Sequence, residues 1–325
     1  MRALICRQWG DVDQLKVAEV PSPVPTETEI LIDVETTAVN YADAIMIAGN
    51  YQTRPRLPFA PGLEVAGTVA ACGKSVTRFR PKDRVMALLN YGGMAEQAIA
   101  AETDTWAIPN AMNFVDAGAF PIAYFSSDVA LRWQGRLESG ETLLVLGAAG
   151  GVGLTAVEIG KALGARVIAG ASTSEKLAVA REHGADVTVN YSEEDLKAQV
   201  MDLTNGSGAD VCFDPVGGQL FDLALSSLGW GGRYLHVGFV GGVPNIPANR
   251  LLVKNRSALG SALRYFRWYA PDKLQTSVTA LLEWYANGQL RPLVTSQLPL
   301  ERGVEAIELL TKRRAYGRVL VLPKK

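Results

Sequence analysis

The first 120 residues contain short apolar runs that are separated by clusters of proline and glycine. The clearest runs cover residues 3–5, 30–34, 65–69 and 84–88. Runs of this length that are bounded by turn residues are typical of short strands. The pattern therefore predicts a β-rich unit at the start of the chain.

The hydrophobic pattern changes after residue 120. Apolar, β-branched runs now alternate with helical patterns, and they cover residues 142–146, 165–169, 187–190, 209–214 and 233–238. One intervening segment, 174–184, has an acidic first turn, a basic last turn and a closing glycine, as expected at the ends of a helix. The alternation predicts βαβ units and a parallel sheet that is covered on both faces.

From about residue 260 the pattern is mixed again. We predict helices near 273–287 and 302–313 and a closing strand at 318–322. These segments could complete the first unit, which would make that unit discontinuous along the chain.

Length and composition are those of an ordinary globular protein. The 325 residues suggest about two domains, and 32 basic against 33 acidic residues leave a net charge of -1, so no field exists to attract nucleic acid or an anionic membrane. The three cysteines lie far apart without a CxxC pair, which favours a reducing compartment. Neither a signal peptide nor a run of 18 apolar residues is present, and we expect a soluble, cytoplasmic protein.

A glycine-rich loop interrupts the apolar stretch after residue 142. It reads Gly-Ala-Ala-Gly-Gly-Val-Gly over 147–153, with a predicted strand before it and a helix after it. Missing side chains let a pyrophosphate approach the backbone N–H groups of Ala149, Gly150, Gly151 and Val152, and the helix dipole favours the negative charge. The spacing departs from strict GxGxxG, and a tight turn without a ligand is the alternative.

The residues after the next predicted strand indicate which dinucleotide binds. Sites for NAD place an acidic residue there against the ribose 2′-hydroxyl, whereas this chain has Ser172, Thr173 and Lys176 nearby. Hydroxyls and an ammonium group suit a 2′-phosphate, so the sequence favours NADPH. Lys176 could instead be an ordinary solvated helix residue.

With this loop in place, the chain resembles the medium-chain dehydrogenase/reductase superfamily nearly end to end, and within it the zinc-free, zeta-crystallin-like quinone oxidoreductases. The segments that carry the resemblance are MRALICRQWG, AVNYADAIMIAGNYQ, FAPGLEVAGTV, YGGMAEQAI, GAAGGVGLTAVEIGKALGA, VTVNYSEEDL, FDPVGG and AYGRVLVLP. The resemblance implies an α/β fold with a GroES-like β-rich catalytic domain, residues 1–120 and 260–325, and a Rossmann domain with a doubly wound parallel sheet, residues 121–259.

The resemblance also implies site residues. Tyr191 and Arg313 match positions that help Lys176 hold the adenosine phosphate, although each could be an ordinary surface residue, and Phe239 matches the nicotinamide side. Zinc-dependent relatives have a cysteine and a histidine where this chain has Asn40 and Leu63. An amide and an isobutyl group cannot replace these ligands, so we expect no metal.

Without a metal, the substrate carbonyl needs a hydrogen-bond donor. By resemblance Asn40 and Tyr51 are the best placed, although Asn40 could only stabilise a turn and Tyr51 could only pack. Asp43 more simply orients the loop than transfers a proton. His183 reads as a helix-end residue, and His236 as a buried strand residue whose ring has hydrogen-bond partners.

These observations predict an NADPH-dependent reductase of quinones or other α,β-unsaturated carbonyl compounds. An enoyl-thioester or acrylate-type reductase is one alternative, and a non-catalytic NADPH-binding protein is another, since some relatives serve as lens or RNA-associated proteins. The basic and aromatic region 249–269 could line a pocket, contact an anionic substrate or form a dimer edge. The resemblance favours a homodimer through the edge of the Rossmann sheet.

Overall fold

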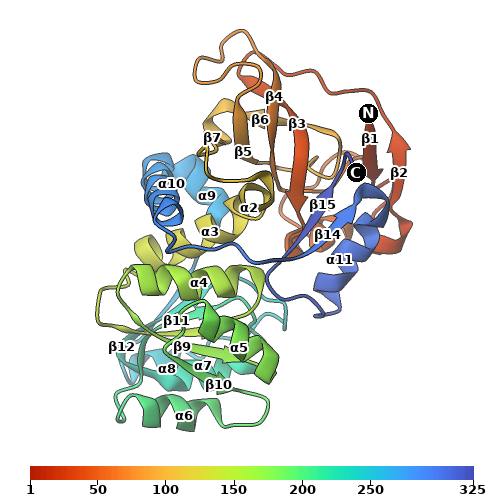
Figure 1. The fold of residues 1–325 in the computed structure, drawn as a ribbon. Coiled ribbons are helices and arrows are strands. Elements are labelled where there is room, and N and C mark those ends of the chain that lie inside the picture. Colours follow the sequence, from red (N-terminus) through yellow and green to blue (C-terminus); the bar gives the residue numbers. More distant parts are fainter. The chain divides into compact units, whose positions relative to one another are not determined.

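A computed structural model describes residues 1–325, and its internal contacts divide the chain into two units (Figure 1). The first unit comprises Met1–Ile122 and Pro292–Lys325, and the second comprises Ala123–Arg291. Both ends of the chain thus build the first unit. No helix combines the length and the apolar character that crossing a membrane would require.

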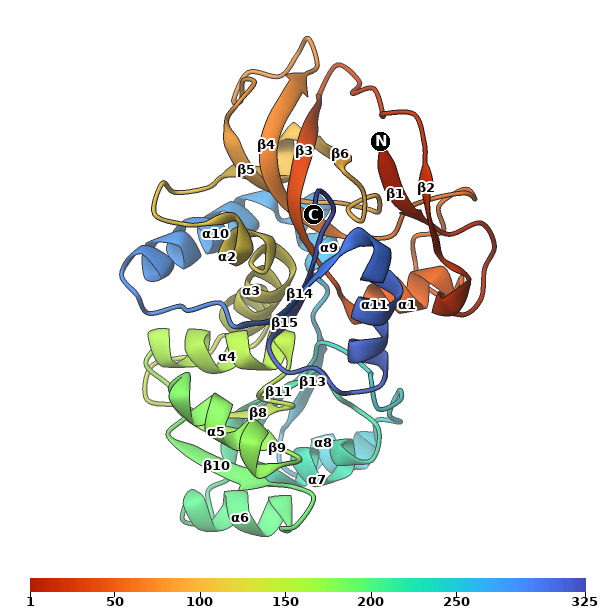
Figure 2. The same cartoon turned by 45° about the vertical axis from the view of Figure 1, so that its right-hand side comes forward.

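The first unit is built on a mixed sheet of seven strands. The order is β14-β15-β3-β4-β5-β7, and β6 pairs with β3. The strands are β3 (Glu29–Ala38), β4 (Glu64–Cys72), β5 (Arg84–Leu88), β6 (Gln97–Ala101), β7 (Thr105–Ala107), β14 (Val294–Pro299) and β15 (Arg318–Leu322). Strand β15 pairs antiparallel with β3, and Figure 2 shows the last strand of the chain against this early one.

Smaller elements complete the first unit. A separate two-stranded sheet joins β1 (Arg2–Ile5) to β2 (Lys16–Glu19). The helices are α1 (Tyr41–Ile47), α2 (Phe114–Gly118) and α11 (Gly303–Thr311). Apolar residues of α1, α11 and β15 share one buried cluster, so the two ends of the chain are held together by a common core.

The second unit contains a parallel sheet of six strands in the order β10-β9-β8-β11-β12-β13. The strands are β8 (Thr142–Leu146), β9 (Arg166–Ala171), β10 (Val187–Asn190), β11 (Ala209–Asp214), β12 (Leu228–His236) and β13 (Ser257–Gly260). From β8 the chain builds the sheet outward to β10 and then returns to β11 on the other side. The strand order therefore reverses between β8 and β11, where α/β folds of this kind bind ligands.

Helices cover both faces of the parallel sheet. Figures 1 and 2 show α4 on one side and α7 and α8 on the other. The helices of this unit are α3 (Pro121–Asp128), α4 (Gly151–Ala162), α5 (Ser174–Glu182), α6 (Leu196–Leu203), α7 (Leu220–Ser227), α8 (Ala248–Leu252), α9 (Leu263–Tyr269) and α10 (Pro271–Ala286), and a π-helical turn follows α3 at Val129–Gln134. The predicted α/β class with a covered parallel sheet is confirmed.

The second boundary between the units differs from the predicted one. Residues 260–291 belong to the second unit rather than the first, because α10 packs against the π-helical turn. There the Trp133 indole N–H donates to Ser277 Oγ at 2.9 Å, and the Arg132 guanidinium lies 5.1 Å from the centre of the Trp284 ring. The first boundary, after Ile122, lies within two residues of the predicted position.

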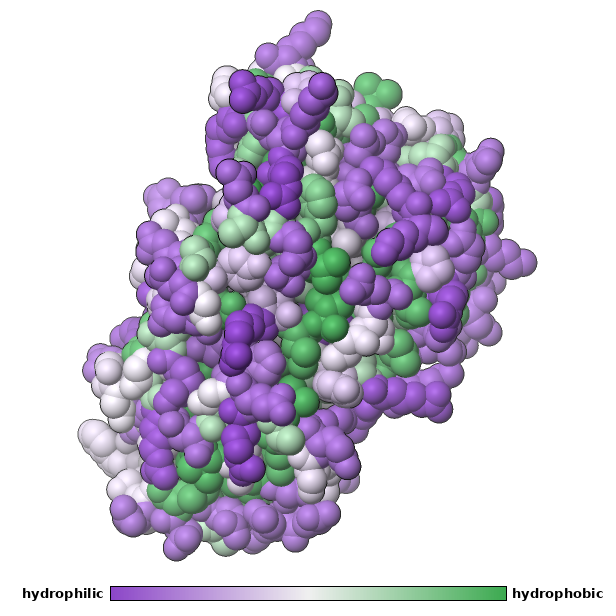
Figure 3. Space-filling model, viewed as in Figure 1, coloured by the Kyte–Doolittle hydropathy of each residue, from purple (hydrophilic) through white to green (hydrophobic).

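Most strand positions agree with the hydrophobic pattern, and β8, β10, β11 and β15 have the predicted ends. Strand β12 begins earlier than predicted, at Leu228, because its glycine-rich start pairs with β11 through an irregular register. Glycine inside a strand is usual at such irregularities. On the face shown in Figure 3, hydrophilic residues dominate the surface and apolar residues are scattered among them.

Candidate cofactor and active site

The turn between β8 and α4 exposes backbone donors. Gly147 adopts a left-handed conformation with φ of +57°, and Gly150 precedes α4 in the N-cap position without a side-chain cap. The first N–H groups of a helix have no partner within the helix. The start of α4, at Gly151 and Val152, can therefore bind an anion, and the helix dipole acts in the same direction.

Gly153 brings α4 close to this turn. A Cβ atom at Gly153 would lie 2.2 Å from the carbonyl oxygen of Gly147, and one at Gly150 would lie 3.2 Å from the same oxygen. No side chain fits the first contact. The third glycine of a dinucleotide-binding turn serves this close packing of helix and strand, so the loop meets the steric condition of the motif despite its irregular spacing.

Two hydroxyl groups support the first turn of α4 from inside the unit. Ser127 Oγ donates to the carbonyl oxygen of Val152 at 2.8 Å, and Thr155 Oγ1 lies 2.7 Å from Ser127 Oγ. Both side chains are buried. The sequence did not predict them, because neither Ser127 nor Thr155 gives a local signal of a partner more than 20 residues away in the chain.

The residues predicted to bind the adenosine phosphate gather at the carboxyl end of β9. Thr173 caps α5 and accepts the Lys176 backbone N–H at 3.4 Å, while Tyr191 donates its backbone N–H to Ala171 O at 3.2 Å. Ser172 and Lys176 are half-buried. The structure thus brings Ser172, Thr173, Lys176 and Tyr191 to one edge, and Arg313 lies in the other unit, directly after α11.

The carboxyl ends of β11 and β12 form a second part of the same edge. Asp214 accepts hydrogen bonds from the backbone N–H groups of Val216 at 2.7 Å and Gly217 at 2.9 Å and from the Tyr234 hydroxyl at 2.7 Å. Phe239 follows β12, and its ring centre lies 5.9 Å from that of His236. The FDPVGG segment is therefore fixed by a buried carboxylate.

The expectation for His236 is wrong in one respect. The residue is buried in β12 as predicted, but neither ring nitrogen has a hydrogen-bond partner. The ring packs against Phe221 and Tyr234, at centre distances of 5.6 and 4.8 Å. Burial lowers the pKa of His236, and the nearby Asp214 carboxylate acts in the opposite direction. His183, at the end of α5, instead lies 2.6 Å from Glu158 through its Nδ1.

In the first unit, Asn40 belongs to a buried polar network. Its amide nitrogen donates to Glu64 Oε1 at 2.9 Å and to Ala38 O at 3.2 Å. Its oxygen accepts from Arg318 Nη1 and Nη2 at 3.1 and 3.2 Å, and Arg318 also pairs with Glu64. Both N–H groups of Asn40 thus already have acceptors, and a substrate carbonyl would compete with them. The role of Asn40 as a donor to substrate stays a prediction.

Asp43 lies beside this network and holds two backbone segments. Its carboxylate accepts the N–H of Asn40 at 2.8 Å and the N–H of Gly62 at 2.9 Å. Burial raises the pKa of Asp43 to about 7, although these two hydrogen bonds act in the opposite direction. Burial also raises the pKa of Glu64, against the effect of Arg318. The network therefore contains two buried carboxyl groups and one guanidinium, and Glu64 and Arg318 were not predicted.

Tyr51 and Leu63 are placed in or beside an apolar cluster. Leu63 is a buried member of the cluster, together with Val39 and Met94, and the half-buried Tyr51 packs against it. No group of three or more His, Cys, Asp or Glu side chains that could hold a metal ion exists in the structure. The residues at positions 40 and 63 do not fit a zinc ion.

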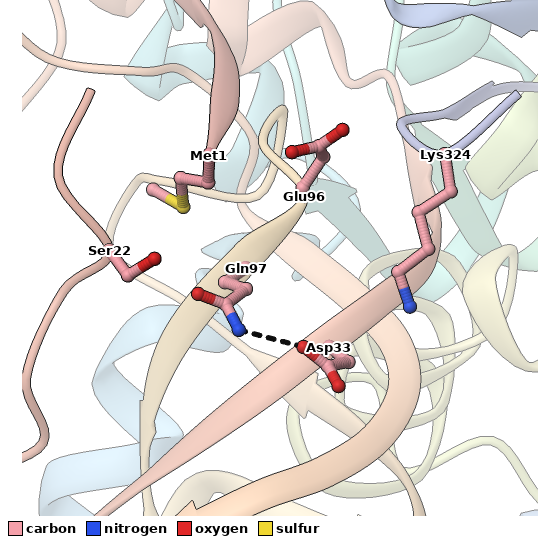
Figure 4. Close-up of a pocket in the computed structure, with 6 residues that line it drawn as sticks. All are labelled: Met1, Ser22, Asp33, Glu96, Gln97 and Lys324. Atoms are coloured by element: carbon pink, nitrogen blue, oxygen red, sulfur yellow. Dashed lines mark hydrogen bonds between the residues drawn. The ribbon is translucent and has the colours of Figure 1, made fainter. Parts of the chain in front are cut away.

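A polar cavity of about 360 Å³ in the first unit does not include any predicted site residue (Figure 4). Gln97 donates from Nε2 to Asp33 Oδ1 across it at 2.8 Å. Its lining residues are Met1, Ser22, Asp33, Glu96, Gln97 and Lys324. We assign it no role in the reaction.

Comparison with known proteins gives consistent matches. Residues 26–110 match the family model of the alcohol dehydrogenase GroES-like domain, and residues 151–284 match that of the zinc-binding dehydrogenases. The quinone oxidoreductase-like protein 2 homolog of Nematostella vectensis is 37% identical over 99% of this chain and 89% of its own length. The quinone oxidoreductase of Lama guanicoe is 34% identical over 100% of this chain and 98% of its own.

The chain belongs to the quinone oxidoreductase branch of the medium-chain dehydrogenase/reductase superfamily. The crystal structure of Escherichia coli quinone oxidoreductase complexed with NADPH covers 99% of this chain and 100% of its own, at a TM-score of 0.93 and 27% identity. The first unit of this chain is thus a GroES-like domain with a mixed sheet, and the second unit is a Rossmann domain. The predicted family and fold are confirmed.

The raised pKa of Asp43 predicts a pH-dependent stability. Between about pH 4 and pH 7 the folded protein keeps a proton on Asp43 that the unfolded chain has released, so this group's contribution to stability is complete below about pH 4 and is lost as the pH rises through 7. The slope from one such proton is at most about 1.4 kcal/mol per pH unit. Urea unfolding at a series of pH values measures it.

The Asp43→Asn variant provides the control, because it removes the titrating group. We expect the difference in unfolding free energy between the two proteins to change by a few kcal/mol between pH 4 and 7 and to become constant at higher pH. A difference that is independent of pH would show that Asp43 is ionised throughout this range.

Proposed function

We propose that this protein is an NADPH-dependent reductase that transfers hydride to quinones or other α,β-unsaturated carbonyl compounds without zinc. The proposal rests on two observations. No side chain caps the backbone N–H groups at the start of α4, and Gly153 lies so close to the carbonyl oxygen of Gly147 that no side chain fits there. This arrangement suits the diphosphate of a dinucleotide. Relatives named quinone oxidoreductase support the acceptor class.

The preference for NADPH rests on the residues at the end of β9. Lys176 and the hydroxyls of Ser172 and Thr173 suit a 2′-phosphate. The Tyr191 ring lies over the end of the same strand, where a Cβ atom at Gly170 would be 3.3 Å from its Cδ1 atom. We propose that Arg313 adds a further positive charge. Glu175 in the same helix stays ionised, since its own backbone N–H and the Thr173 hydroxyl lower its pKa, and it therefore acts against the bound phosphate.

The bound cofactor would supply the hydride, and the protein would polarise the acceptor. For this task we propose Tyr51 and Asn40, and a substrate carbonyl would compete with the protein acceptors that both N–H groups of Asn40 already have. Asp43 would hold Asn40 and Gly62 in position, and Phe239 would contact the nicotinamide ring. Ala149, Gly151 and Val152 would bind the diphosphate through their backbone N–H groups. The predicted donor Gly150 already donates its N–H to the carbonyl oxygen of Gly147 at 2.9 Å and would have to exchange this bond for the diphosphate.

We further propose a homodimer that forms through the outer edge of the Rossmann sheet, and a location in the cytoplasm. Strand β13 ends the sheet, and the neighbouring Trp230, Leu252 and Val253 are strongly exposed. An open sheet edge with apolar neighbours invites pairing with another chain. The three cysteines are all free, which supports a reducing compartment.

Substitution of Lys176 tests the cofactor assignment. We expect Lys176→Ala to raise the KM for NADPH about tenfold, the cost of one charge-assisted hydrogen bond, and to leave the KM for NADH within about twofold. Oxidation of each cofactor with 1,4-benzoquinone or 9,10-phenanthrenequinone, followed by absorbance, gives both values. Lys197→Ala, on α6, is the control.

Two results would count against the proposed function. If Lys176→Ala raises the KM for NADPH and the KM for NADH by the same factor, Lys176 does not bind the 2′-phosphate. Failure to oxidise NADPH with any quinone, enone or crotonyl thioester would favour a protein that binds the cofactor without catalysis.

The dimer predicts a sedimenting mass of twice the 34.8 kDa chain. A charge at the proposed interface should separate the subunits, so Trp230→Glu should sediment mainly as a monomer at micromolar concentration. A wild-type protein that is already monomeric under these conditions would contradict the proposed assembly.

A further inference from the structure

Glu158 is a buried carboxylate that the proposed reaction does not use. It lies in α4, seven residues after Gly151. Its Oε2 accepts the Tyr124 hydroxyl at 2.6 Å, and its Oε1 accepts the Arg291 backbone N–H at 3.2 Å. His183 Nδ1 lies 2.6 Å from the same Oε1. Both oxygens of one buried side chain thus have partners from three other segments of the chain.

Two of these partners belong to the connections between the two units. The chain leaves the first unit after Ile122, at what we call the first connection, and returns to it after Arg291, at the second connection. Tyr124 lies two residues after the first connection, and Arg291 is the last residue before the second. A single carboxylate therefore holds both connections at one point of the second unit.

The first connection lies in α3, and this helix is fixed on both sides of the unit boundary. Before the boundary, Ile122 donates its backbone N–H to Glu64 Oε2 at 2.7 Å. After the boundary, α3 lies against α4 (Figures 1 and 2), where Thr155 Oγ1 is 3.2 Å from Ala123 O. Helix α4 therefore joins the proposed diphosphate site, at its start, to the first connection.

The second connection belongs to an irregular segment beside a cavity. Residues 287–293 form neither helix nor strand, and Gly288 and Arg291 line part of a cavity of about 280 Å³. A segment with empty space on one side has few packing contacts to hold it. Arg291 is instead held by two hydrogen bonds, one to Glu158 and one from its guanidinium to Glu182 O at 2.8 Å.

We infer that Glu158 is a positioning residue of the reaction, which fixes the two connections and so sets how the first unit presents the acceptor to the bound cofactor. The inference rests on the proposed function, which uses Tyr51 of the first unit and Phe239 of the second. Hydride transfer between groups on different units depends on the segments that link them, because a misplacement of about 1 Å can cost about a hundredfold in rate. Glu158 itself contacts neither the cofactor nor the acceptor in this assignment.

Two substitutions at position 158 separate hydrogen bonding from charge. Glu158→Ala removes both acceptor oxygens and releases both connections. In Glu158→Gln the amide oxygen still accepts from His183 and Arg291. Its amide nitrogen donates to the Tyr124 hydroxyl, which accepts as well as donates. We therefore expect Glu158→Gln to retain most of the wild-type behaviour and Glu158→Ala to lose it.

Hydrogen exchange followed by mass spectrometry measures the two connections directly and needs neither cofactor nor substrate. In Glu158→Ala we expect exchange of segments 121–126 and 287–293 to be at least about tenfold faster, the cost of a lost hydrogen bond to a charged group. Glu158→Gln should stay within about threefold of the wild type. The matched control is Lys161→Ala, nearly one turn further along α4, because Lys161 pairs with Asp186 and bonds to neither connection.

Single-turnover oxidation of bound NADPH by 9,10-phenanthrenequinone measures the consequence for the reaction. Glu158→Ala should lower the rate of hydride transfer at least about tenfold, and Glu158→Gln should restore most of it. The Kd for NADPH, from calorimetric titration, should change by less than about threefold, because the proposed diphosphate donors lie at the start of α4, where Ser127 rather than Glu158 holds the turn. A merely structural defect would raise this Kd and lower the rate together.

Tyr124→Phe is the second variant if Glu158→Ala does not fold, as judged by its unfolding curve. It removes one hydroxyl from the buried cluster and leaves the Arg291 bond to Glu158 in place. We expect faster exchange at 121–126 alone and a loss of hydride-transfer rate of at least about threefold.

Three outcomes would overturn the inference: exchange in Glu158→Ala that is faster at one connection only or at neither, a hydride-transfer rate that this variant leaves unchanged, or a loss of rate that Glu158→Gln shows in full. A failure of the proposed function looks different. In that case the wild type oxidises NADPH with no acceptor, while hydrogen exchange still reports whether Glu158 holds both connections.

Discussion

The contact between the first turn of α4 and the carbonyl oxygen of Gly147 is the constraint on which the proposed cofactor site depends. It leaves no room for a side chain at Gly153, and it brings the uncapped helix start to the point where the strand order reverses. Ser127 and Thr155 hold the same turn from within the unit. Backbone N–H groups, a helix dipole and supporting hydroxyls thus act at one place, which is the requirement for binding a diphosphate.

At the two positions where zinc-dependent relatives have metal ligands, the first unit has Asn40 and Leu63. Here Asn40 joins Glu64 and Arg318 in a buried network, and Leu63 packs into the apolar core. Removing one charged member of such a network leaves the opposite buried charge uncompensated, which strongly destabilises the folded protein. The network therefore fixes the loop that contains Asn40, and Asp43 ties that loop to the turn at Gly62.

The sequence allowed the fold to be predicted where the signal is local. Alternating apolar runs located β8, β10 and β11 to the residue, and the glycine turn lies between β8 and α4 as predicted. Features that depend on tertiary contacts were missed. Arg318 and Glu64 are 254 residues apart in the chain, so the sequence around either residue does not indicate that they pair. The boundary after Arg291 follows from packing of α10 on a distant helical turn, and the missing partners of the His236 ring are likewise visible only in three dimensions.

Calorimetric titration of the protein with NADPH tests the central claim most directly, with the wild type and Gly153→Ala compared side by side. The account predicts one bound NADPH per chain in the wild type and an affinity at least about tenfold lower in the variant, because a methyl group at this position forces α4 away from the turn and removes aligned N–H donors. Unfolding curves would establish that the variant is folded. Absence of binding by the wild type, or equal affinities for the two proteins, would contradict the account.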